Sequence, residues 1–283
     1  MAFQKMSNNE VLGDTAAHFF KSGNTLRADN FDDVIKISEL LPTDRKIEYD
    51  IWYDKNDKTT VHGYVYTDMA NQFLYIRPAC TVRTYQTMID AAQSDITQEG
   101  EMLYEKMQLC ADKYRLRKAK KAHDFVIFLP GSNIFDKISD ISRLQNAVSQ
   151  GAKCKLHPLS AAPMVAYLKN KLGSDCLLDK NMSGHQLMTQ ASIVGAFTNS
   201  EMGLIASALG KKVYVFNDMR GVYTYSAVYN AVFPGESYSE ERMKRLLSCK
   251  SSGLISVHAN DPQENVDLFF QRFEDVDVRL PCA

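Results

Sequence analysis

The 283-residue sequence lacks several patterns that mark common classes of site. Its six cysteines form no C-x-x-C pair, which argues against a zinc site or a disulfide framework. No apolar run approaches the roughly 20 residues that span a bilayer, and the first residues lack a signal-peptide apolar stretch. No G-x-G-x-x-G follows an expected strand, so a Rossmann dehydrogenase is not expected. With 45% hydrophobic residues, we expect a folded, soluble, cytoplasmic protein.

The net charge of −1 excludes a protein whose whole surface binds nucleic acid. The charge is unevenly distributed, however. Residues 1–112 hold 11 Lys and Arg against 18 Asp and Glu, whereas residues 113–121, here called the basic run, hold six cations. These cations are Lys113, Arg115, Arg117, Lys118, Lys120 and Lys121. Such a run indicates either a phosphate-binding rim or a solvated helix end.

Residues 121–283 alternate short apolar runs with amphipathic stretches. Strands are predicted at 125–129, 154–158, 176–178, 193–197 and 213–216, and helices at 138–149, 162–172, 184–190 and 202–209. This alternation is typical of a doubly wound parallel sheet. A helix at 240–248, a strand at 254–257 and a last helix at 262–273 follow. Residues 1–120 mix expected strands with helical spacing, so we predict an α/β protein with domains 1–120 and 121–283.

Polar or glycine-containing segments follow the strands of the second half. They are Gly131-Ser132-Asn133, residues 155–158, residues 179–184 and residues 198–203. In an open parallel sheet, ligands bind outside the carboxyl ends of the strands. Helices begin after these segments, and the amide groups at a helix N-terminus suit phosphate. A nucleotide-type anion is therefore the expected ligand.

Three short motifs occur in order along this half. Lys155-x-His157-Pro158 ends a predicted strand, Ser183-Gly184-His185 begins a predicted helix, and Thr198-Asn199-Ser200-Glu201 ends a third apolar run. Together they resemble the nucleotide-sugar half of GT-B glycosyltransferases over residues 124–217. The similarity is closest to the group with a K-x-H-P motif, such as capsule-polysaccharide transferases and bacterial sialyltransferases.

The resemblance implies a donor site for a nucleotide sugar, with uridine the expected base, in the Rossmann-like domain at 121–283. His157 would contact the nucleotide, and Ser200 would receive a phosphate near the start of the helix at 202. Glu201 stands where the family usually has Ser or Thr, and would lie near a ribose or sugar hydroxyl. The remaining donor-site residues expected are Gly131, Ser132, Asn133, Lys155, Ser183 and His185. Helix N-termini, Lys155 and hydroxyls would stabilise the leaving diphosphate without a metal or other cofactor.

The resemblance also implies an acceptor-side domain at 1–120, which would hold the catalytic base. Asp14, just before an expected helix, and His18, one turn later, are the candidates. Asp14 also suits a plain helix N-terminus, just as Ser200 suits a plain helix cap.

Small enzymes of this type resemble phage glycosyltransferases that modify 5-hydroxymethylcytosine in DNA, and the basic run would then contact duplex phosphates. The alternatives are transfer to a cell-envelope or capsule saccharide and a non-catalytic nucleotide or nucleic-acid binding module. The oligomeric state stays open.

Overall fold

The computed structural model describes residues 47–48, 63–68, 73–78, 81–109, 117–119, 121–132, 134–158, 160–220, 225–256 and 258–275. These residues form two compact units. Unit 1 takes the described residues of 26–113 and 230–283, and unit 2 takes those of 114–229. The predicted mixed α/β fold class is confirmed in this general form.

Unit 2 is built on a parallel sheet. Its described strands are β4 (Phe125–Phe128), β5 (Lys153–Lys155), β6 (Leu177–Leu178), β7 (Ile193–Ala196) and β8 (Lys212–Val215). They lie in the order β6-β5-β4-β7-β8, and every neighbouring pair is parallel. The chain builds outward from β4 to β6 on one side, then returns to place β7 and β8 on the other. The order therefore reverses between β4 and β7, as in a doubly wound sheet.

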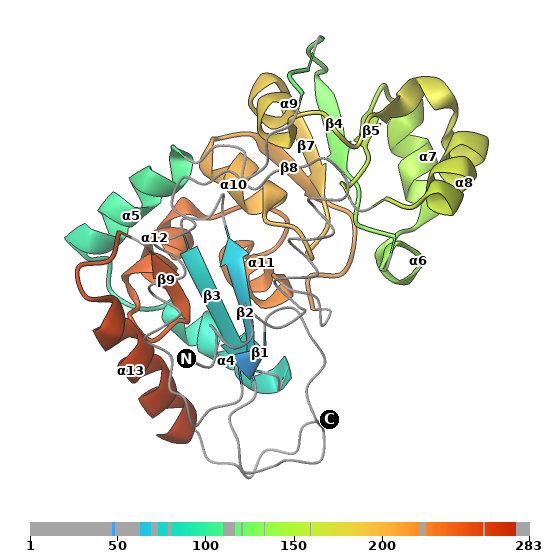
Figure 1. Cartoon of the computed structure of the whole chain (residues 1–283). Helices are drawn as coiled ribbons and strands as arrows, with labels where there is room; N and C mark the ends of the chain where they lie inside the picture. The colour runs from blue at the N-terminus through green and yellow to red at the C-terminus, as the bar shows by residue number, and fades with distance from the viewer. Residues whose placement is uncertain are drawn as a thin grey trace, which may run out of the picture. The chain divides into compact units, whose positions relative to one another are not determined.

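Helices cover both faces of this sheet. They are α6 (Phe135–Ile138), α7 (Ile141–Ser149), α8 (Ala162–Leu172), the short 3₁₀ helix η1 (Ser174–Cys176), α9 (Gly184–Gln190) and α10 (Met202–Ala208). The boundary with unit 1 falls within α11 (Ser226–Val232), after Tyr229. Ile127 and Leu129 pack in one core with side chains of α6, α7 and α8; α7 and α8 lie side by side (Figure 1). Strand side chains alternate between faces, so Val126 and Phe128 face the other side, where α9 contacts β4.

Unit 1 carries a different sheet. Its described strands β1 (Ile47–Glu48), β2 (Gly63–Asp68), β3 (Phe73–Pro78) and β9 (Leu254–Ser256) lie in that order. β1 is parallel to β2, but β3 is antiparallel to both β2 and β9. Helices α4 (Thr81–Ala91), α5 (Gln98–Gln108), α12 (Glu240–Ser248) and α13 (Pro262–Asp275) belong to this unit (Figure 1). α12 packs along α5, and α13 packs against β9.

This arrangement differs from the predicted division at residue 120. The segment from residue 230 onward returns to unit 1, because β9 pairs with β3 and α12 packs on α5. The functional division into an acceptor-side domain at 1–120 and a donor-side domain at 121–283 stays a prediction. No helix in the described ranges is long and apolar enough to cross a membrane.

Gly203 lets α10 approach β7 closely. A Cβ atom at this position would lie 2.3 Å from the Tyr229 hydroxyl and 2.8 Å from the Cβ of Ala196. Both distances are shorter than packed atoms allow, so a larger residue must push the helix away from the strand. The same close approach keeps Tyr229 beside the start of α10.

We expect Gly203→Ala to lower the free energy of unfolding by about 1–3 kcal/mol, because overpacking forces the helix to shift. Denaturant unfolding measures this change. Gly184→Ala is the matched control, since a Cβ there meets no atom closer than 3.5 Å. Equal losses in the two variants would contradict the close-approach explanation.

Candidate functional site

The reversal of strand order puts the loops after β4 and β7 next to each other. Because the strands are parallel, both loops leave the same edge of the sheet, here called the carboxyl edge. The two loops leave this edge in opposite directions with no crossover helix between them, and open α/β sheets bind ligands at this place. The candidate site is therefore the carboxyl edge of unit 2, centred between β4 and β7.

Thr198 fixes the beginning of the loop after β7, residues 198–201, here called the switch loop. Its backbone N–H donates to Oδ1 of Asn217 at 2.9 Å, and its hydroxyl oxygen accepts from Nδ2 of the same side chain at 2.8 Å. The Ser226 hydroxyl donates to the same oxygen, also at 2.8 Å. Thr198 is thus tied to the end of β8 and to α11, and its role is to hold the loop.

Ser200 lies one residue before the buried Glu201. Its hydroxyl oxygen accepts from the N–H of Met202 at 3.2 Å, which closes a turn at the start of α10. Its carbonyl accepts from the Tyr229 hydroxyl at 2.9 Å. A hydroxyl that accepts one hydrogen bond still carries a proton that a phosphate oxygen can take. Ser200 is therefore a turn residue just before the N-cap Glu201, and its hydroxyl proton remains suited to an anion.

Glu201 brings a carboxylate to the same loop. The side chain is only 8% exposed and stands immediately before α10, where the helix dipole favours negative charge. Carboxylates are seldom this buried unless they are paired or functional. Glu201 therefore places a buried carboxylate in the switch loop, at the start of α10.

The loop after β4 contributes Gly131 and Ser132. The Gly131 carbonyl accepts from the N–H groups of Ile134 and Phe135, which forms a tight turn into α6. The Ser132 hydroxyl accepts from the N–H of Ala161 at 2.7 Å and donates to the Met164 sulfur at 3.2 Å. Ser132 therefore joins this loop to the start of α8. Asn133 lies outside the described residues.

Lys155 ends β5, and its side chain is only 4% exposed. Its ammonium group donates to the carbonyl of Leu156 at 2.7 Å and to the carbonyl of Lys180 at 2.9 Å. The second bond holds the loop after β6, residues 179–183. We expected Lys155 to reach a phosphate, but these bonds show it fastening one carboxyl-edge loop to another. His157, two residues on, is half-buried.

The loop after β6 leads into α9. Ser183 is buried, and its hydroxyl accepts from the N–H of Gln186, which caps the helix. His185 in the first turn is half-buried. A Cβ on Gly184 would lie 3.5 Å from both Phe128 and Met202. The loop and α9 thus pass over the end of β4 and reach the start of α10, which brings Ser183 and His185 toward the switch loop.

Part of the basic run lies beside this loop. Arg117 forms a β-bridge with Met182, its N–H donates to the carbonyl of Asn181, and its guanidinium pairs with Asp179. Lys118 and Lys121 are exposed. The interpretation of the basic run as a helix end is wrong at Arg117, which pairs as a strand.

Lys113, Arg115 and Lys120 lie outside the described residues, as do the candidate bases Asp14 and His18. Within the described ranges, no group of three or more His, Cys, Asp or Glu side chains could hold a metal ion. The metal-free donor site stays a prediction.

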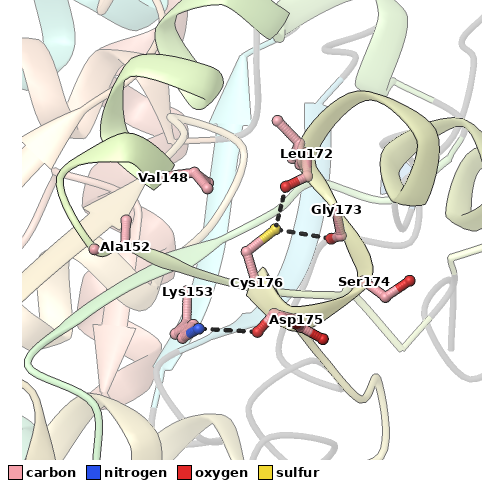
Figure 2. A pocket seen from close by; sticks show the side chains of 9 residues that line it. Val148, Ala152, Lys153, Leu172, Gly173, Ser174, Asp175 and Cys176 are labelled. Atoms are coloured by element: carbon pink, nitrogen blue, oxygen red, sulfur yellow. Dashed lines mark hydrogen bonds between the residues drawn. The ribbon is translucent and has the colours of Figure 1, made fainter.

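A hollow of about 560 Å³ lies at the opposite, amino edge of the sheet, lined by residues 151–153 and 172–176 among others. Figure 2 shows the Cys176 thiol donating to the carbonyls of Leu172 and Gly173, and Lys153 donating to the Asp175 carbonyl. Burial raises the pKa of the Cys154 thiol to about 12 and also raises that of Cys176. Neither thiol is a nucleophile at neutral pH, so we place the candidate site at the carboxyl edge.

Sequence reasoning missed the residues that hold the switch loop. Asn217 directly follows a predicted strand, so the rule that selected the other carboxyl-end residues could have found it. Tyr229 gives no such signal, because it reaches Ser200 from a helix 29 positions away along the chain. The tethering role of Lys155 also needed the structure, since its partners are backbone carbonyls.

No protein-family model and no curated protein matches this chain. Among solved structures, it is similar to Thermosulfurimonas dismutans KpsC, a beta Kdo 2,7 transferase, with 16% sequence identity and a TM-score of 0.42. The match covers 76% of this chain and 81% of KpsC. A similarity of this size leaves the chemistry to be argued from the chain's own residues.

We expect Lys155→Met to lower the free energy of unfolding of the unliganded protein by about 1–3 kcal/mol, because two buried carbonyls lose their charged donor. Lys153→Met is the matched control two residues earlier on β5. Its ammonium bonds only near the surface, to the Asp175 carbonyl, so its loss should change stability by no more than about 0.5 kcal/mol. A more stable Lys155→Met variant would instead identify Lys155 as an uncompensated charge kept for a ligand.

Proposed function

We propose that this chain is a glycosyltransferase of GT-B type, which moves a sugar from a nucleoside diphosphate sugar to a hydroxyl acceptor. The observation that carries the proposal is the reversal of strand order between β4 and β7, which gathers the K-x-H-P segment, the loop after β6 and the switch loop at one edge. Nucleotide ligands bind at such points in open α/β sheets. The three motifs occur in the same order as in GT-B glycosyltransferases, which supports glycosyl transfer as the reaction.

In this proposal the donor lies along the carboxyl edge. His157 and His185 contact the nucleotide, and Ser200 and Ser183 donate hydroxyl protons to phosphate oxygens. The carboxylate of Glu201 accepts from a ribose or sugar hydroxyl. Gly131 and Ser132 form the wall between β4 and α8. Lys155 acts indirectly, by holding residues 179–183 in place.

The transfer step needs two kinds of group. The acceptor oxygen attacks the anomeric carbon, and the bond from that carbon to the phosphate oxygen breaks, with the electron pair leaving on the diphosphate. Hydrogen-bond donors fixed at the site stabilise this charge without a metal. A base removes the acceptor's hydroxyl proton, and Asp14 and His18 are the proposed candidates.

For the acceptor, the basic run supports a duplex carrying 5-hydroxymethylcytosine, since exposed lysines bind phosphates. The pairing of Arg117 with Asp179 removes one cation from that surface and favours the second candidate, a cell-envelope or capsule saccharide. Both acceptors present a hydroxyl group, so the donor chemistry is the same.

We expect UDP or CDP to raise the melting temperature of the protein in EDTA, because no metal is needed. Ligand at a hundredfold excess over its Kd stabilises by about 2.7 kcal/mol. His157→Ala should weaken this binding by about 1.5–3 kcal/mol, the contribution of a charged hydrogen bond. Calorimetric titration measures the loss.

His123→Ala is the control for that titration. This residue precedes β4 at the amino edge, where burial and the charges of Lys153 and Lys121 lower its pKa. It should bind nucleotide as the parent does. Absence of any shift without added magnesium or manganese would contradict the metal-free proposal.

The acceptor is tested by duplex binding across a salt series. If the basic run contacts DNA, log affinity should fall with log salt by about 0.9 per phosphate contact, and the variant Lys118→Glu with Lys121→Glu should flatten the slope. Lys169→Glu with Lys171→Glu, on the exposed face of α8, is the matched charge change. Equal slopes in both variants, with sugar transferred to an oligosaccharide, would establish the saccharide as acceptor.

A further inference from the structure

Three polar side chains at the carboxyl edge have a buried atom that forms no hydrogen bond among the described residues. These atoms are Oγ of Ser160, Oδ1 of Asn181 and Oδ1 of Asn199. Ser160 is only 4% exposed. A buried polar atom without a partner costs free energy comparable to a lost hydrogen bond. Three such atoms at one edge of one sheet need an explanation.

Each atom belongs to the segment after a different strand. Ser160 follows β5, Asn181 follows β6, and Asn199 follows β7. With strands about 4.8 Å apart, the carboxyl ends from β6 to β7 span about 14 Å, which suits an elongated small molecule. Because α9 contacts both β4 and α10, the segment that leads into it crosses toward the switch loop.

The backbone around these side chains is fixed by other bonds. The Ser160 N–H donates to the His157 carbonyl, and the Asn181 N–H donates to the Asp179 carboxylate. The Asn181 carbonyl accepts from Arg117, and Asn199 stands between the bonded residues Thr198 and Ser200. These bonds fix the backbone from which the three side chains extend. The site is therefore built before a ligand binds.

The kind of atom limits the kind of ligand. A carboxamide oxygen only accepts hydrogen bonds, and so do the oxygens of an ionised phosphate. Asn181 and Asn199 therefore cannot satisfy their oxygens on the phosphates of a nucleotide. They need O–H or N–H groups, which the neutral parts of a nucleotide sugar carry.

We infer that Ser160, Asn181 and Asn199 form a subsite for the hydroxyl-bearing, uncharged part of the donor. This inference rests on the proposed function. It assigns the phosphates and the uncharged part of the donor to different groups of the protein. The phosphates bind to backbone amides and hydroxyl protons, while these three side chains bind the ribose or the transferred sugar. They are specificity-determining residues, since a donor lacking the matching hydroxyl would leave their atoms unpaired.

The test compares Ser160→Ala, Asn181→Ala and Asn199→Ala with Ser207→Ala. Ser207 is a matched control, because it is buried to a similar degree, 6% exposed, and its hydroxyl also lacks a partner. It lies in the last turn of α10, from which the chain turns into β8 at the amino edge. Each binding affinity is measured by calorimetry for UDP, CDP, UDP-glucose, CDP-glucose and inorganic pyrophosphate.

We expect all four variants to be at least as stable as the parent without ligand, because each loses an unsatisfied buried group. The three edge variants should bind the nucleotides or their glucose derivatives about three- to tenfold more weakly. Ser207→Ala should bind them as the parent does. Pyrophosphate, which offers no such hydroxyl groups, should bind all variants equally.

The two sources of hydroxyl groups give different results. A loss already present with UDP or CDP assigns the contact to the nucleoside, and a loss seen only with the glucose derivatives assigns it to the sugar. If the parent binds nucleotides and the edge variants bind them equally well, the inference is wrong and the proposed function stands. If the parent binds none of these nucleotides or their glucose derivatives, both fall.

Discussion

Parallel pairing of β7 with β4 is the constraint on which the candidate site depends. Parallel strands all end at one edge, so every loop that follows a strand of unit 2 is brought to that edge. Because β5 and β6 extend from the other side of β4, the loops after β4 and β7 diverge with no helix between them. The remaining loops then close around this position. A site at this place follows from topology before any side chain is considered.

Short strands make this edge depend on side chains. β6 has two residues, and its pairing with β5 comprises only two positions, so its ladder alone holds the following loop weakly. Two further bonds hold this loop. The Lys155 ammonium donates to the Lys180 carbonyl, and the Arg117 backbone N–H donates to the Asn181 carbonyl. The switch loop is fastened similarly by Asn217, Ser226 and Tyr229. Hence several residues that look like ligand contacts in the sequence also maintain the loops.

The local elements were predictable because their signals are local. α8, α9 and α12 begin and end where the sequence predicts. Ser183 and Ser239 cap two of these helices, and Gly173 stops the third with φ of 90°. In these helices the apolar spacing and the capping residues indicate the same first and last residues. The β7 run was equally clear because both of its faces are covered.

The predictions that failed, or could not be made, concern contacts between residues far apart in the sequence. The strand at 254–257 was found, but its antiparallel partner β3 lies about 180 residues earlier, and no local signal specifies that pairing. A helix end was one of the two interpretations of the basic run, whereas Arg117 pairs with a loop 65 positions later. Lys155 illustrates the deeper difficulty. A lysine before His-Pro reads as a phosphate contact, yet burial at the end of β5 directs its ammonium to carbonyls.

The bonding of the Lys155 ammonium to backbone carbonyls affects how an anion would be bound at this edge. With the lysine committed to Leu156 and Lys180, a phosphate would rely on dipolar donors, such as hydroxyls and backbone N–H groups, more than on a formal positive charge. Such donors are fixed in place by the sheet and need no reorganisation as negative charge develops on a leaving group. Fixed dipoles also discriminate by geometry, because a phosphate displaced by one ångström loses their hydrogen bonds while a flexible lysine would follow it. An edge held by such bonds therefore favours precise placement of an anionic ligand over strong attraction to it.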